Sequence, residues 1–197
     1  MISLWRFTRN RYTRAVYDAL QAAGITATRM YEYQASVAHP DTVGSRPPPN
    51  DVTIEVVSAS EVRARDIDLD FSIPVDVLDG ELVVVASAEG SPIGRTVVNP
   101  GSTPYVHPLE RSVPVPGAYI RRVFVLPEQR GQGVASTALR AAITHAQDEF
   151  DVKHVTALIA ADNRPSQWLF ESCGFKRSRV HEYVRAGPLS RYRIRAI

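Results

Sequence analysis

The sequence predicts an α/β fold, and three observations along one stretch carry that prediction. Residues 118–126 are rich in β-branched and aromatic side chains, which suit a half-buried strand. Residues 134–150 place small and apolar side chains at every third or fourth position, as one face of a helix requires. The turn between them contains Gly131 and Gly133, whose lack of side chains leaves the backbone open to a ligand.

A glycine turn that opens a helix is a common phosphate site, because free backbone N–H groups and a partial positive charge meet there. A plain connection without a ligand is the alternative. A P-loop is excluded because no Gly-Lys-Ser/Thr ends the turn. A dinucleotide-binding turn is disfavoured, since it requires an acidic residue near the end of the next strand, and Asp151 precedes that strand.

A second sequence block, a strand followed by a short helix, comes after the glycine turn and its helix. Residues 152–160 predict a strand, and the segment after it predicts a short capped helix. Asp162 is the expected N-cap, Pro165 is tolerated in a first turn, and Gly174 ends the helix.

Together the two blocks resemble the GNAT superfamily of acyl-CoA N-acyltransferases. Arg130, Gly133 and Ala135 fit the acyl-CoA turn of that family, and Asn163 opens a helix that closes on Gly174-Phe175, as its second motif does. The resemblance covers roughly residues 52–186. It implies a GNAT fold, in which helices flank a mixed, mostly antiparallel sheet that splays between its fourth and fifth strands.

The remaining segments fit that order of elements. Residues 52–57 predict a first strand, followed by a short helix from Ala59 or Ser60 and an acidic loop. Residues 82–88 and 93–98 predict a hairpin, and two last strands are expected within 175–185 and 189–196.

Residues 99–117 depart from the family pattern. Five prolines exclude a central strand there and predict an ordered loop, which borders the acceptor side of the cleft in relatives. Its candidate substrate-wall residues are Tyr105, His107, Glu110 and Arg111. A surface excursion is the alternative.

The resemblance divides the chain into a GNAT N-acetyltransferase domain at 51–197 and an N-terminal extension at 1–50. Residues 10–23 predict an amphipathic helix, Tyr31 and Tyr33 hint at a strand, and 46–50 predict a proline-rich linker. We expect the helix to pack on the domain, with a homodimer contact or a partner site as alternatives.

The resemblance also implies acetyl-CoA as co-substrate, an amine as acceptor, and no metal. Backbone groups at the end of strand four would pair with the pantetheine arm, the glycine turn would hold the pyrophosphate, and the side-chain amide of Asn163 would reach the arm. The expected cofactor-binding residues are Val123, Phe124, Val125, Arg130, Gly131, Gln132, Gly133, Val134, Ala135, Ser136 and Asn163.

Catalysis departs from the family pattern at two positions. Many relatives carry a tyrosine acid seven residues after the asparagine, where this chain has Phe170, and some carry a glutamate base five residues before it, where this chain has Leu158. A thiol leaving group of pKa about 8.5 needs little help, so proximity and backbone polarisation are one substitute. The candidate acids and bases are Tyr119, His181, Glu182, Tyr183 and His107. A module that binds acyl-CoA without turnover is the alternative.

Charge is unevenly distributed along the chain. Residues 41–90 carry a net charge of −8 and residues 174–197 carry +6, although the whole chain is only +2. The acidic stretch predicts a cationic amine acceptor, with a solvated surface as the alternative. Arginines near both termini suggest nucleic-acid binding as an alternative class of function, but no RNA-binding signature accompanies them. They are Arg6, Arg9, Arg11, Arg14, Arg191, Arg193 and Arg195.

Composition sets the cellular context. Cys173 is the single cysteine, so an internal disulfide framework is excluded and a reducing compartment is expected. No apolar run approaches the length of a membrane span, and no signal peptide is evident at the N-terminus. These features predict a cytoplasmic protein without a membrane contact.

Overall fold

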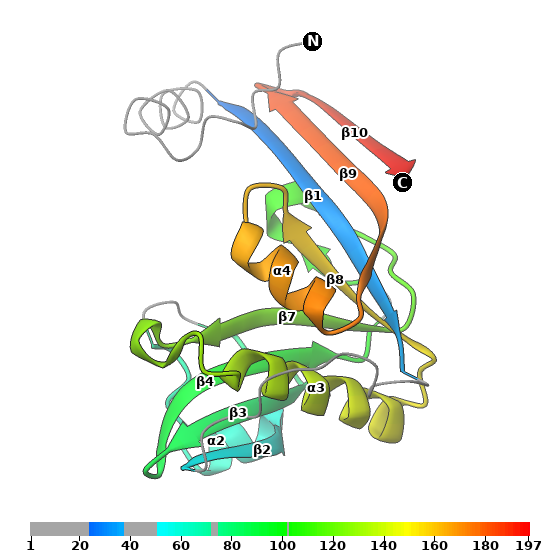
Figure 1. The fold of residues 1–197 in the computed structure, drawn as a ribbon. Helices are drawn as coiled ribbons and strands as arrows, with labels where there is room; N and C mark the ends of the chain where they lie inside the picture. Colours follow the sequence, from blue (N-terminus) through cyan, green and yellow to red (C-terminus); the bar gives the residue numbers. More distant parts are fainter. Residues whose placement is uncertain (1–23, 38–50, 72–74, 102) are drawn as a thin grey trace.

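A single large sheet organises the computed structural model, which describes residues 24–37, 51–71, 75–101 and 103–197. Eight strands run in the order β10-β9-β1-β8-β7-β4-β3-β2, and β5 and β6 form a separate two-stranded hairpin (Figure 1). The strands are β1 (Ile25–Ser36), β2 (Val52–Ser58), β3 (Leu82–Ala88), β4 (Ser91–Asn99), β5 (Tyr105–Val106), β6 (Arg111–Ser112), β7 (Ala118–Val125), β8 (His154–Ala160), β9 (Lys176–Ala186) and β10 (Leu189–Ala196). The helices are α2 (Ala59–Ala64), α3 (Val134–Phe150) and α4 (Arg164–Ser172), with short 3-10 turns at His107–Leu109 and Pro127–Gln129.

Strands β7 and β8 form the one parallel pair of the described sheet, and they touch only at their first residues. The register pairs Ala118 with Val155 and Tyr119 with Thr156, after which the two strands diverge. All other neighbours in the sheet are antiparallel. The predicted mixed, splayed sheet is therefore confirmed, with β7 and β8 as the fourth and fifth strands of the family pattern.

Residues 25–36 were predicted to lie in an extension outside the domain. In the structure they form strand β1 of the large sheet. It pairs with β8 on one side and with β9 on the other, so it lies in the middle of one half of the sheet. Tyr33 on this strand is fully buried in the main hydrophobic cluster. The alternation of Tyr31 and Tyr33 indicated a strand, but no local signal indicated its two partners. The predicted helix at 10–23 and linker at 46–50 lie outside the described residues.

The main core lies between the sheet and helices α3 and α4. Small residues on the buried face of α3 allow its backbone to approach the strands closely, and they are joined there by Leu139 and Ile143. Phe170 from α4 meets Phe175 edge to face, with ring centroids 4.8 Å apart. The small residues are Ala138, Ala142 and Ala146. A second apolar layer, which includes α2, covers the opposite face of β2, β3 and β4.

Local chemistry explains where several elements begin or end. Ser58 and Glu61 form a capping box at the start of α2. Glu89 and Gly90 both have positive φ, as the tight turn between β3 and β4 requires. Asn163, rather than the expected Asp162, caps α4 by accepting a hydrogen bond from the Ser166 N–H. The described part of the proline-rich stretch contains the β5–β6 hairpin.

Candidate active site

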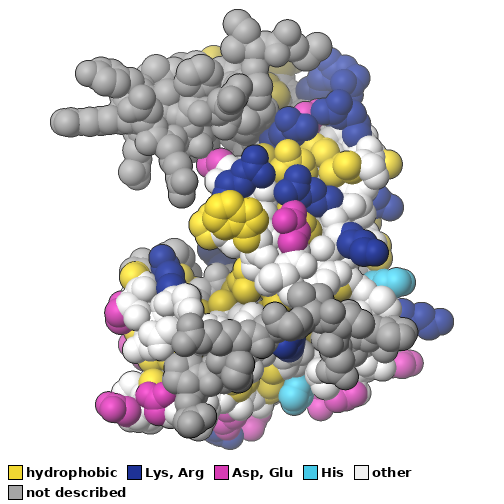
Figure 2. Space-filling model, in the orientation of Figure 1, with side chains coloured by type: hydrophobic (Ala, Val, Ile, Leu, Met, Phe, Trp, Pro, Cys, Tyr) yellow, Lys and Arg dark blue, Asp and Glu magenta, His cyan; other side chains and the backbone are white. Residues whose placement is uncertain are grey.

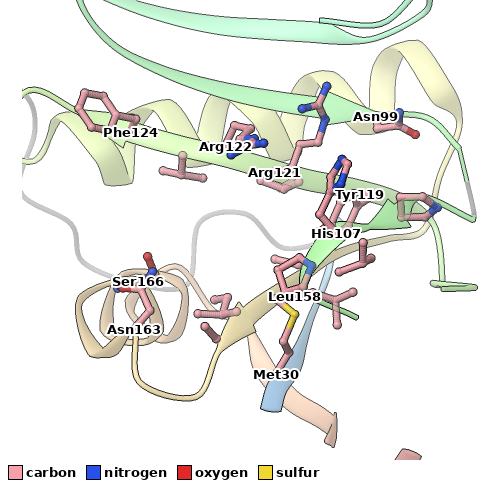
Figure 3. A pocket seen from close by; sticks show the side chains of 18 of the residues that line it. Met30, Asn99, His107, Tyr119, Arg121, Arg122, Phe124, Leu158, Asn163 and Ser166 are labelled. Atoms are coloured by element: carbon pink, nitrogen blue, oxygen red, sulfur yellow. The ribbon is translucent and has the colours of Figure 1, made fainter. Parts of the chain in front are cut away.

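A cleft of about 600 Å³ opens where β7 and β8 diverge. One wall is β7 from Tyr119 to Phe124, and the other is the second half of β8 with the first turns of α4. The β5 strand and His107 close one end, and Met30 of β1 contributes to the floor. Figure 3 shows Asn163 and Ser166 on α4 across the cleft from the side chains of β7.

The wall formed by β7 contains a β-bulge. Arg95 of β4 pairs with Phe124 and Val97 pairs with Arg121, so two residues of β7 oppose Thr96 alone. Arg122, the first of those two, has φ 56°, a left-handed conformation that costs a non-glycine residue about 1–2 kcal/mol. Because β8 leaves β7 after Tyr119, the edge of β7 that faces the cleft carries backbone groups that β8 does not pair. Such an edge can pair with the amides of an extended ligand.

The glycine turn follows β7 after the short 3-10 turn at Pro127–Gln129. Gly131 and Gly133 have φ values of 75° and 86°, which favour glycine strongly. Gly133 is the N-cap of α3 and brings no side chain, so the first amides of that helix have no side-chain cap. Seventeen residues of helix stand behind these amides, an arrangement suited to an anion.

Side chains around the turn are folded back onto the backbone. Arg130 donates from Nε to the Val125 carbonyl at 2.9 Å, with its guanidinium carbon 5.7 Å from the centroid of the Phe124 ring. The Ser136 hydroxyl donates to the Gly133 carbonyl at 2.8 Å, and Gln132 donates from Nε2 to the Glu128 carbonyl at 3.3 Å. Val134 packs into a small apolar cluster with Val125, which anchors the turn.

Asn163 combines a structural and a ligand-facing position. Its side-chain Oδ1 accepts from the Ser166 N–H at 3.3 Å, which fixes the amide plane at the start of α4. The residue is exposed and lines the cleft, and its Nδ2 group makes no hydrogen bond within the described part of the chain. The amide can therefore donate into the cleft.

Two of the five catalytic candidates line the cleft, and His181, Glu182 and Tyr183 lie outside it on β9. Tyr119 and His107 line it, from β7 and from the hairpin respectively. Tyr119 is 8% exposed, and burial raises its pKa to about 12, while the charges of Arg121 and Arg122 act in the opposite direction. His107 is exposed and contacts Tyr105 edge to face.

His181 lies outside this cleft, in a buried network. Its Nε2 is 2.8 Å from a Glu32 carboxylate oxygen, and its Nδ1 is 2.6 Å from the Tyr192 hydroxyl. Both His181 and Glu32 are fully buried. Ser178 and Gln34 also donate to the Glu32 carboxylate.

Tyr183 also lies outside this cleft and anchors the hairpin that closes it. Its hydroxyl donates to Glu110 at 2.7 Å, and Arg185 pairs with the same carboxylate at 2.9 Å. The Arg111 guanidinium carbon lies 3.9 Å from the centroid of the Tyr192 ring. Glu110 and Arg111, two expected substrate-wall residues, thus dock the hairpin on β9 and β10, while Tyr105 and His107 line the cleft.

The two departures from the family pattern both line the cleft. Phe170 and Leu158 are apolar residues of its wall and carry no group that can transfer a proton. Polar residues that sequence reasoning missed stand nearby, namely Arg95, Arg121, Arg122 and Asn99, together with Asp76 of the acidic stretch. The adjacent arginines at 121 and 122 within an apolar strand were the available signal.

The acidic stretch divides between local contacts and the cleft. Asp79 pairs with Arg63, and Asp68 and Asp70 accept hydrogen bonds from backbone N–H groups of their own loop. Asp76 alone of the acidic residues in the described part of this loop lines the cleft. Figure 2 shows the charge polarity of the chain, with arginine and lysine side chains gathered on the upper half, which holds β9 and β10.

Comparisons with known proteins agree with this fold. The model of the acetyltransferase (GNAT) family matches residues 53–175, more than half of the sequence, and the chain belongs to that family. A search of curated proteins found no match. In the described part of the chain, no helix is long and apolar enough to cross a membrane.

Solved structures share the fold at low sequence identity. A tandem GNAT protein from the clavulanic acid biosynthesis pathway is 15% identical with a TM-score of 0.56, over 86% of this chain and 58% of its own. A GCN5-related N-acetyltransferase from Kribbella flavida is 13% identical with a TM-score of 0.55, over 88% and 64%. A Drosophila protein is 16% identical with a TM-score of 0.55, over 90% and 57%. The chain thus spans less than two thirds of the length of each.

Proposed function

We propose that this protein transfers an acetyl group from acetyl-CoA to a primary amine. The observation that carries the proposal is the continuous path along β7, from the cleft at the splay to the uncapped first turn of α3. An extended pantetheine arm pairs with the free edge of β7 around Val123 and Phe124. The pyrophosphate binds the amides of residues 131–136, and Asn163 donates to the arm from the other wall.

The chemistry then needs a neutral amine, a polarised thioester carbonyl and a stabilised thiolate. Backbone N–H groups at the bulge supply the polarisation. Tyr119, whose phenol stays protonated because its pKa is about 12, donates a hydrogen bond to the thiolate rather than losing its proton. His107 accepts the ammonium proton, since imidazole is the side chain suited to that role near neutral pH.

Thermal unfolding with and without acetyl-CoA tests cofactor binding. At about one hundred times the dissociation constant, the ligand stabilises a single-site binder by about 2.7 kcal/mol, or roughly 5–10 °C for a chain of this size. Gly133→Glu should abolish the shift, because it adds a side chain and a negative charge to the turn. Gly187→Glu is the matched control, since Gly187 also has positive φ (56°) but lies in the β9–β10 turn. An unchanged shift in Gly133→Glu contradicts the proposed cofactor site.

A silent acyl-CoA-binding module is the second candidate, favoured by Phe170 and Leu158 at the positions of the usual acid and base. Release of free thiol from acetyl-CoA with any amine excludes it. Binding without turnover across a broad amine panel excludes the enzyme instead.

We also propose that the protein is cytoplasmic. The support is its single cysteine, Cys173, which is buried and free.

A further inference from the structure

Three arginines line the acceptor side of the cleft, and two of them are compensated. Arg121 donates from Nε and from its second terminal nitrogen to the two oxygens of buried Glu81, at 2.9 and 2.5 Å. It also donates to the Asp76 carbonyl at 2.6 Å. Arg95 lies 5.2 Å from the Phe71 ring centroid and 5.3 Å from that of Phe124, and it donates to the Leu69 carbonyl.

Arg122 is different. It is exposed and lines the cleft, and within residues 24–37, 51–71, 75–101 and 103–197 it makes no hydrogen bond, ion pair or ring contact. Its left-handed conformation in the bulge is unfavourable for arginine, and strained residues of this kind cluster at ligand sites. Figure 3 shows Arg121 and Arg122 next to one another on β7, beside the cleft.

Among the described residues, no carboxylate is paired with Arg122. Burial lowers the pKa of Arg95, and the positive charge of Arg122 lowers it further, while Asp70 acts in the opposite direction. Glu81 is already occupied by Arg121 and Asn99. Asp76 is the other carboxylate along this cleft in the described part of the chain, so an amine and an anion can each find an opposite charge.

We propose that the acceptor amine also carries an anionic oxygen group, a carboxylate or a phosphate, which Arg122 binds. A guanidinium presents two parallel N–H donors that match either group. The acceptor is then an amino acid or an amino phosphate rather than a purely cationic polyamine. This inference rests on the proposed acetyl transfer, because it identifies the acceptor of that reaction.

The test uses matched amine pairs that differ only in the anionic group. Amino acids are compared with their amides, and phosphoethanolamine with ethanolamine, by thiol release from acetyl-CoA. We expect kcat/KM to favour at least one anionic member about tenfold or more over its neutral partner, and the favoured pair distinguishes carboxylate from phosphate. Arg122→Gln should bring that ratio close to one, and Arg122→Lys should retain part of it. Arg65→Gln is the control, because Arg65 is exposed and paired with Glu55 of β2 and Glu61 of α2.

Other results overturn the inference. A preference for neutral or cationic amines over the anionic ones would overturn it. An Arg122→Gln variant that lowers kcat/KM equally for both members of a pair would also overturn it. A rise in the KM of acetyl-CoA in Arg122→Gln would assign this arginine to the cofactor. If no amine is acetylated although acetyl-CoA binds, the proposed activity fails, and calorimetry of the CoA-loaded protein with the same amines decides the anion site. Binding of the anionic members that is lost in Arg122→Gln supports it, and no binding or equal binding rejects it.

Discussion

At its first two residues, Ala118 and Tyr119, β7 is paired with β8, whereas beyond Tyr119 it is paired only with β4. The paired end is tightly packed: Ala118 and Val155 are fully buried, and the Thr156 hydroxyl donates to the Pro116 carbonyl at 2.7 Å. The open end carries the bulge, a left-handed arginine and two left-handed glycines. One strand thus provides both the paired end from which the cleft opens and the unpaired edge that can bind a ligand.

The largest effect is expected at the paired end, for Gly117→Ala. A Cβ atom there would stand 1.8 Å from the His154 carbonyl oxygen, and the residue has φ 68°. Backbone on both sides must move, so we expect a loss of at least about 3 kcal/mol of unfolding free energy, or no folded protein. Gly187→Ala is the control, because its Cβ meets nothing within 4 Å and only the φ of 56° is unfavourable. Urea unfolding of both variants measures the difference, and similar losses would contradict the packing argument.

Tyr119→Phe probes the boundary between the two ends. We expect kcat to fall about 100-fold, because a hydrogen-bond donor at the reacting centre is lost, while the KM of acetyl-CoA stays close to the parent value. Tyr183→Phe should leave kcat within about twofold, since its hydroxyl is bonded to Glu110 outside the cleft. Steady-state kinetics on the best amine separates them, and equal losses would assign catalysis elsewhere.

The buried network around Glu32 of β1 is expected to make the stability of the protein depend on pH. Burial raises the pKa of Glu32, but hydrogen bonds from His181, Ser178 and Gln34 outweigh it, so the net pKa lies below the ordinary value of 4.5. A lowered pKa in the folded state stabilises the protein above pH 4.5, and this stabilisation is lost as pH falls through the folded pKa. Glu32→Gln should therefore flatten the loss of stability below pH 4.5 in denaturant titrations. An unchanged pH profile would remove Glu32 from the account of acid stability.

The smallest effect is expected at the open end, for Arg122→Gly. Glycine adopts left-handed φ without strain but loses more conformational entropy on folding, so a net gain of about 0.5–1 kcal/mol is expected. The variant should lose the preference for anionic amines at the same time. Thermal unfolding beside the amine pairs measures both changes, and a destabilised Arg122→Gly would mean that the arginine side chain supports the fold.

Local patterns predicted the glycine turn and the elements around it. The strand at Ala118–Val125, the helix at Val134–Phe150 and the helix ending before Gly174 all appear where period, glycine and capping residues indicated. The one-residue error at the α4 cap has a simple cause, since Asp and Asn are equally good caps and 162 and 163 are adjacent. These signals are local, so a single chain segment contains them completely.

Long-range pairing decided the rest. Nothing near residues 25–36 specifies that β1 lies between β8 and β9, because a strand pattern does not name its partners. The same limit applies to side chains: His181 is buried against Glu32 while Tyr119 and His107 reach the cleft, although all are polar aromatic residues near predicted strands. The sequence by itself determined the strands, helices and glycine turn, through periodicity and backbone preference. Only the tertiary structure decided which face each side chain takes, since that depends on neighbours brought together from distant parts of the chain.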